Sequence, residues 1–218
     1  MQPIIEFFSS LTDPEWIMQH GGLYIVVLIV FIETGVFFGF FLPGDSLLFI
    51  AGIVIANSLS PFSIPAVNLL YWIALIGTAG VLGNYVGYLF GTKSDRFLLS
   101  RKDNWIFKKK FFYQAKDFYD RKGGGAIVFA RFLPIVRTFA PIVAGMVKMK
   151  FAKFSFYNIL GSFLWAGIIV SAGFLLGENQ WAKENLEKII IGIGVITFSP
   201  VVMKLFFKKR NRLKPASV

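Results

Sequence analysis

Two arginines, Arg131 and Arg137, lie in an otherwise apolar stretch of the chain that also contains Pro134 and Pro141. A charged guanidinium group costs about 2.5–3.5 kcal/mol at the centre of a membrane helix, and closely spaced prolines prevent one continuous helix. The apolar segment on each side of this break is about 15 Å long as a helix, roughly half the thickness of the hydrocarbon core of a bilayer. Residues 123–147 are therefore predicted to enter and leave the membrane on the same side, as a re-entrant hairpin with the prolines at its tip.

The composition is that of an integral membrane protein. Of the 218 residues 56% are hydrophobic, and the mean hydropathy is +0.64. The chain has no cysteine and one histidine, His20, so it offers no basis for a disulfide framework, a thiolate metal site or a histidine-based triad. We therefore expect one all-α membrane domain over residues 1–218, with no metal, no cofactor and no catalytic residue.

The basic residues are distributed very unevenly along a chain whose net charge is +11. No lysine or arginine precedes Lys93, whereas segment 92–122 and the C-terminal tail are rich in both. Positively charged loops stay on the cytoplasmic side, so these two regions are expected inside and the N-terminal segment outside. A basic chain can also bind nucleic acid. Here the charges flank apolar spans, so anionic lipids of the inner leaflet are the expected partners and nucleic acid is not.

A second break follows the apolar segment that contains Glu33. Pro43 and Gly44 interrupt the chain and Asp45 comes next. The apolar segment after them is about 16 Å long as a helix, too short to cross a bilayer. Residues 23–57 are therefore predicted to form a first re-entrant hairpin, entered from the outer side, with Pro43 and Gly44 at its tip. The segment before the break is long enough to span alone, so two full spans stay an alternative.

Hydropathy and charge divide the rest of the chain. The segments that complete the topology are three spans (66–91, 154–177 and 186–206), an interfacial segment on the outer face (1–22), a basic amphipathic segment on the inner leaflet (92–122) and a basic cytoplasmic tail (207–218). The first of these spans carries a face of small residues suited to close helix packing, made of Gly80, Gly83, Gly87 and Gly91.

The two halves of the chain resemble each other weakly. Gly52 follows the break at Pro43, and Gly145 follows the break at Pro134, each directly after an alanine. Each hairpin is followed by a long span. This pattern predicts an inverted repeat of two oppositely oriented hairpins, an arrangement that places transporter sites near the membrane midplane.

Four charged residues are thus expected at membrane depth, namely Glu33, Asp45, Arg131 and Arg137. If the hairpin tips meet near the midplane, the arginines can bind a phosphate or diphosphate group, because the guanidinium fork matches its oxygens. The carboxylates are then the candidate proton carriers, since burial favours the neutral form of an acid. Asn158 is expected to support the site by bonding a neighbouring helix or broken backbone.

Two other functional classes compete with this interpretation. In a purely structural protein the two acids and two bases would neutralise one another, and Asp45 would cap the helix that follows it. Buried arginines are an expensive way to build a scaffold. A lipid phosphatase would need a nucleophile grouped with a histidine or a metal, and the sequence contains no such group. We therefore expect a transporter and not an enzyme.

The same residues resemble a known family. The pattern R-F-x-P-x-x-R-x-x-x-P-x-x-A-G-x-x-x-M, followed by F-x-x-x-N-x-x-G-x-x-W, is similar to that of the DedA membrane proteins of the SNARE-associated or VTT-domain superfamily. Its positions here are Arg131, Phe132, Pro134, Arg137, Pro141, Ala144, Gly145, Met149, Phe154, Asn158, Gly161 and Trp165. The family's other signature, an acidic residue followed by F-x-P-G-[DE], matches Phe38 to Asp45. The resemblance runs from about Glu33 to Trp165.

The resemblance implies translocation of a lipid carrier across the bacterial cytoplasmic membrane by paired, inverted hairpins. We therefore expect a proton-coupled transporter of a phosphorylated polyprenyl lipid, with undecaprenyl phosphate as the leading candidate. A scramblase or flippase for a phospholipid such as phosphatidylethanolamine, and a proton-coupled cation antiporter, stay open as alternatives. Association of the chain into a homo-oligomer also stays open.

Overall fold

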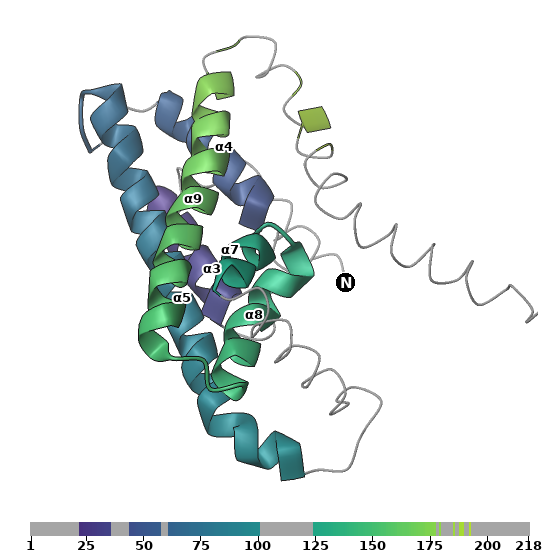
Figure 1. Cartoon of the computed structure of the whole chain (residues 1–218). Coiled ribbons are helices and arrows are strands. Elements are labelled where there is room, and N and C mark those ends of the chain that lie inside the picture. The colour runs from purple at the N-terminus through teal and green to yellow at the C-terminus, as the bar shows by residue number, and fades with distance from the viewer. Residues whose placement is uncertain are drawn as a thin grey trace, which may run out of the picture.

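A computed structural model of the chain describes residues 22–35, 44–57, 61–100 and 124–177, with a few isolated positions between 179 and 192. Side chains are described within these ranges except at 95–100, 134 and 135. The described part of the chain is helical, without strands (Figure 1). Its helices are α3 (Leu23–Gly35), α4 (Gly44–Ala56), α5 (Pro65–Ser100), α7 (Gly125–Arg131), α8 (Pro134–Met146) and α9 (Phe151–Gly177).

Two of these helices are long and apolar enough to cross a membrane. They are α9 along its whole length and the part of α5 from Pro65 to Ser94. The span predicted at 66–91 lies within α5, which continues without a break to Ser100, into the segment predicted on the inner leaflet. The other segments predicted at the N-terminus, on the inner leaflet beyond residue 100, and from residue 186 to the tail lie almost entirely outside the described residues.

The helices on either side of the predicted breaks are short. Helix α8 has 13 residues and α7 has 7, and both have described residues at each end. The described parts of α3 and α4 have 13 residues each and meet residues 36–43, which lie outside the description. At 1.5 Å per residue a 13-residue helix is about 20 Å long, well below the ~30 Å of a hydrocarbon core. In Figure 1 the short helices lie alongside the two long ones, with α7 and α8 forming a bent pair across the middle of the bundle.

The break in the second half is narrower than the sequence predicted. Helix α7 ends at Arg131, and α8 begins at Pro134 after an extended residue, Leu133, with φ −113° and ψ 109°. This conformation is usual before a proline, and a proline at the first helical position loses no hydrogen bond. Pro141 was expected at the tip but lies inside α8. Pro43, the corresponding residue of the first half, lies outside the described residues.

Helix α4 packs along α9 through glycines on both partners. A Cβ atom at Gly52 would overlap the backbone of α9 at Val170 and Phe174. In return, a Cβ atom at Gly173 would overlap the carbonyl group of Phe49, one turn before Gly52. The two backbones therefore approach as closely as glycine alone permits.

Helix α8 packs along α5 in the same register. A Cβ atom at Gly145 would overlap the backbone of α5 at Tyr88 and Thr92, and one at Gly91 would overlap the carbonyl group of Ile142. The spacing of these residues along each helix is the same as in the α4–α9 pair. The short helix of each half thus packs on the long helix of the other half in one repeated geometry, which gives the weak sequence repeat a structural basis.

The other glycines of α5 receive different neighbours. Gly83 contacts the end of α3, where its Cβ atom would meet Thr34 and the backbone of Gly35. A Cβ atom at Gly80 would meet the guanidinium group of Arg131. The glycine face of α5 therefore serves close packing, as the sequence predicted, and at Gly80 it also makes room for a charged side chain.

The outside of the bundle is apolar. Large side chains that are at least half exposed include Leu28, Leu70, Phe129, Phe156, Ile168 and Leu175. Soluble proteins rarely expose so many large apolar groups, whereas helices that face lipid do so as a rule. The polar and charged side chains described next are buried instead.

Candidate functional site

Arg137 joins three helices through its side chain. It lies in the first turn of α8, and its Nη2 atom donates to Oε1 of Glu33 near the end of α3. Its Nη1 atom donates to Oδ1 of Asp45 in the first turn of α4. The side chains of Arg137 and Glu33 are 7% and 2% exposed, and that of Asp45 is 16% exposed. This arginine therefore has two carboxylate partners in a largely dry environment.

The Glu33 carboxylate lies against the N-terminus of α4. A Cβ atom at Gly44, the first residue of that helix, would overlap this carboxylate. Its Oε2 atom is buried without a hydrogen-bond partner among the described residues. Gly44 was predicted as a hairpin tip because of its flexibility, and the structure adds that its missing side chain makes room for Glu33.

Arg131 is also buried but is bound very differently. It is the last residue of α7 and is 4% exposed. Its Nη1 atom donates to Oδ1 of Asn158 over 3.3 Å. Its Nε and Nη2 atoms have no partner in the part of the chain that the structure describes, and neither carboxylate bonds to it there. A cation that keeps unbonded donors in a dry site is costly unless an anion binds there.

Asn158 holds Arg131 through a network of buried polar groups. The Nδ2 atom of Asn158 donates to the carbonyl oxygen of Val81 over 3.1 Å, so its Oδ1 atom serves as the acceptor. Asn84 donates to that Oδ1 atom over 2.7 Å. Ser162 donates to the Asn158 carbonyl oxygen over 2.7 Å. The network links α5, α7 and α9 at the point where Arg131 enters the bundle.

Trp165 was named in the sequence only as a position of the family pattern, without a predicted role. In the structure it contacts both arginines. It is 1% exposed, and its ring centre lies 5.2 Å from Cζ of Arg131 and 5.1 Å from Cζ of Arg137. Its Nε1 atom donates to Oδ1 of Asp45 over 3.0 Å. The spacing from Asn158, seven residues earlier, places both side chains on one face of α9 and could have indicated this role.

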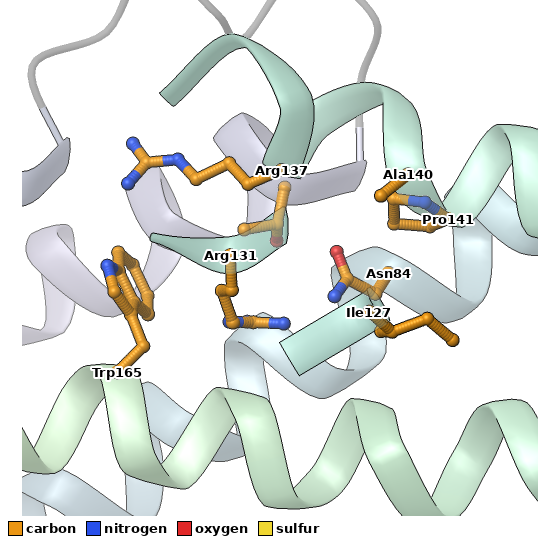
Figure 2. A pocket seen from close by; sticks show the side chains of 8 residues that line it. Asn84, Ile127, Arg131, Arg137, Ala140, Pro141 and Trp165 are labelled. Carbon is orange, nitrogen blue, oxygen red and sulfur yellow. The ribbon is translucent and has the colours of Figure 1, made fainter. Parts of the chain in front are cut away.

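A pocket opens between the two arginines (Figure 2). Its walls are formed by Thr34, Asn84, Ile127, Arg131, Arg137, Ala140, Pro141 and Trp165. The enclosed volume is about 10 Å³, which is about the room that one water molecule needs. A phosphate group therefore fits between these walls only after a neighbouring helix or side chain moves.

The four charges predicted at membrane depth therefore form an unequal set. Glu33, Asp45 and Arg137 meet in one cluster, as the structural interpretation of these residues required. Arg131 is outside this pairing and faces the pocket with its charge unmatched by a carboxylate. With its groups ionised, this cluster of two acids and one base has a net negative charge, and the positive charge of Arg131 lies beside it.

The sequence of the chain is similar to those of known membrane proteins. Residues 25–175 match the VTT domain family. Protein DedA of Escherichia coli K12 is 37% identical over 192 residues, which are 88% of this chain and 85% of that protein. The inner membrane protein YqjA of the same strain is 32% identical over 204 residues, 91% of this chain and 85% of YqjA.

A more distant organism has a relative that aligns over nearly the whole chain. The uncharacterized membrane protein Rv0364 of Mycobacterium tuberculosis H37Rv is 33% identical over 220 residues, 97% of this chain and 94% of its own. No solved structure matches the chain. The matched region contains both short-helix pairs, both long helices and all four buried charges. The chain is therefore a membrane protein of the DedA family, built on a VTT domain.

Proposed function

We propose that this protein moves a phosphorylated lipid across the bacterial cytoplasmic membrane, with undecaprenyl phosphate as the leading candidate. The phosphate group binds in the pocket between Arg131 and Arg137, while the lipid tail stays in the surrounding bilayer. The kinship with DedA and YqjA supports a role in membrane transport. The apolar outer surface and the small polar pocket support a substrate that is amphiphilic.

The observation that carries this proposal is the unmatched charge of Arg131. Its free Nε and Nη2 atoms are the donors that a guanidinium group uses in a paired bond to a phosphate. The observed arrangement is closed around them, so the phosphate enters when α7 or the Trp165 side chain moves. Anion binding then removes the cost of an unbonded buried cation.

The acids account for proton coupling in this proposal. With all four groups ionised, the charges of Glu33 and Asp45 cancel those of Arg131 and Arg137. A bound phosphate would add negative charge to a buried site, which is costly. A proton taken up by one of the acids offsets that charge and frees a donor of Arg137 for the phosphate. Lipid and proton therefore cross together.

The short helices also fit the predicted topology. We propose that the α3–α4 and α7–α8 pairs are re-entrant hairpins that enter from the outer and the inner side, because helices about 20 Å long do not cross a bilayer. The C-terminal tail is then cytoplasmic, and its basic residues contact anionic lipids of the inner leaflet.

The test uses purified protein in liposomes that contain a labelled polyprenyl phosphate. We expect the wild-type protein to move the label between leaflets without releasing inorganic phosphate, and Arg131→Lys to lose most of this transport although the charge is kept. Release of phosphate would instead indicate an enzyme. Equal movement of phosphatidylethanolamine would favour a phospholipid scramblase.

The control separates substrate binding from charge balance. Two variants keep the total charge of the cluster. They are Arg137→Lys and the double variant Asp45→Arg with Arg137→Asp. If the arginines only neutralise the acids, these variants and Arg131→Lys would transport normally, and the phosphate site would have to be abandoned. Each variant is first shown to be folded by thermal unfolding in detergent.

A further inference from the structure

Trp165 is the side chain that the two arginines share. Its indole ring contacts both guanidinium groups, and its N–H group bonds to Asp45, which is also bonded to Arg137. Figure 2 shows the ring beside both arginine side chains at the edge of the pocket. Asp45 therefore lies at the edge of the ring that Arg131 contacts.

The repeated packing does not account for this ring, which is buried in the hydrophobic core. In the register set by the two glycine contacts, Gly173 of α9 corresponds to Gly91 of α5. Trp165 precedes Gly173 by the same number of residues as Gly83 precedes Gly91. Gly83 contacts the preceding short helix directly, at Thr34 and Gly35. The equivalent position of the second half holds an indole, which packs in the core and also contacts both arginines.

Without the indole the four charges could pair differently. Arg137 would keep Glu33, and Arg131 could take Asp45, which gives two separate neutral pairs. Such pairing is electrostatically favourable in a dry site, because each buried cation then has its own carboxylate. It would also leave no unmatched cation for an anionic head group. The observed arrangement places both acids on Arg137 instead.

We propose that Trp165 is a positioning residue that prevents this alternative pairing. Its ring lies against Arg131, and its N–H group helps to hold Asp45 on Arg137, so that the charge of Arg131 is kept for the phosphate of the substrate. This inference rests on the proposed phosphate site. It adds that Trp165, an uncharged residue, keeps Arg131 free for the phosphate by preventing an ion pair between Arg131 and Asp45.

The experiment measures binding of a short polyprenyl monophosphate, farnesyl phosphate, to purified protein in detergent. Trp165→Leu should bind it about tenfold more weakly, a loss of the size of one hydrogen bond to a charged group. Trp165→Phe keeps an aromatic ring against Arg131 and should lose less. Phe154→Leu, at another fully buried aromatic of α9, is the matched control and should bind like the wild type.

Removal of the competing acid is the decisive step. Asp45→Asn added to Trp165→Leu should restore binding to within a few-fold of the wild type, because residue 45 can then no longer pair with Arg131 while Glu33 stays on Arg137. A residue that only fills space gives no such rescue. If Trp165→Leu binds normally, or if the double variant binds as weakly as Trp165→Leu, the positioning role is refuted. If Trp165→Leu does not fold, farnesyl phosphate binding is compared instead between Trp165→Phe and the double variant Trp165→Phe with Asp45→Asn.

The same binding measurements distinguish a wrong role for Trp165 from a wrong assignment of the phosphate site. If the wild-type protein does not bind farnesyl phosphate, or if Arg131→Met binds it equally well, the phosphate site itself is refuted. If binding depends on Arg131 but Asp45→Asn does not rescue Trp165→Leu, only the role of Trp165 is refuted.

Discussion

The first short helix of each half, α3 and α7, differs far more between the halves than the second, α4 and α8. The described part of helix α3 has 13 residues and contacts α5 backbone to backbone at Gly83. Helix α7 has 7 residues and ends at Arg131, against the Trp165 and Asn158 side chains of α9. By contrast, α4 and α8 pack on the opposite long helix in one register.

This difference separates the frame of the molecule from its site. Where the halves are alike, glycines bring helix backbones together and no charge is involved. Where they differ, polar side chains take the place of close backbone contact and a pocket results. A duplicated fold can therefore keep one packing contact in both copies while the other changes to hold a substrate.

The largest effect is expected from a test of the relative orientation of the halves. Asn57 follows α4 and Lys148 follows α8, both are exposed, and the chain has no cysteine of its own. If the halves are inverted, an impermeant thiol reagent should label Asn57→Cys in intact cells and Lys148→Cys only after permeabilisation. Labelling of both from the same side would show that the halves are parallel.

The next largest effect should distinguish the two arginines. Arg137→Met leaves Glu33 and Asp45 buried without a cation, and loss of one member of such a pair costs about 3–5 kcal/mol of unfolding free energy. Arg131→Met removes a cation that has no carboxylate partner, so we expect little loss of stability and complete loss of phosphate binding. Thermal unfolding in detergent measures the first effect. Equal destabilisation by both changes would show that the charges share one network.

A smaller effect should come from the repeated glycine contacts. Gly52→Ala and Gly145→Ala each force a methyl group into a helix backbone, and overpacking of this kind costs about 1–3 kcal/mol. The two variants should lower thermal stability by similar amounts, because the contacts have the same geometry. Gly167→Ala is the control, since its Cβ atom would meet nothing within 4 Å. Unequal losses would show that only one of the two interfaces bears on stability.

The sequence was sufficient for the parts of this architecture that depend on chain length and composition. Short apolar segments beside Pro134 predicted short helices, and the glycines of α5 predicted close packing. The buried charges were identified because they are rare in apolar segments.

The unequal pairing of the charges could not be predicted from the sequence. Which acid bonds to which arginine depends on the crossing of helices far apart in the chain, as with Glu33 and Arg137. The break at Pro141 was expected from the lack of an N–H group alone. Neighbouring helices support α8 on both sides of that residue, so the helix continues through it. The contacts of Trp165 with the charged residues could not be predicted either, because aromatic residues are common in apolar spans.

The proline inside α8 has a mechanical consequence. Pro141 has no N–H group to donate to the carbonyl oxygen four residues earlier, which belongs to Arg137. The helix is therefore most compliant directly after the residue that binds both acids. Its far end packs closely on α5 at Gly145, and its first turn carries the ion-paired side chain of Arg137. A change of charge on Glu33 or Asp45 therefore acts on the part of α8 that precedes Pro141.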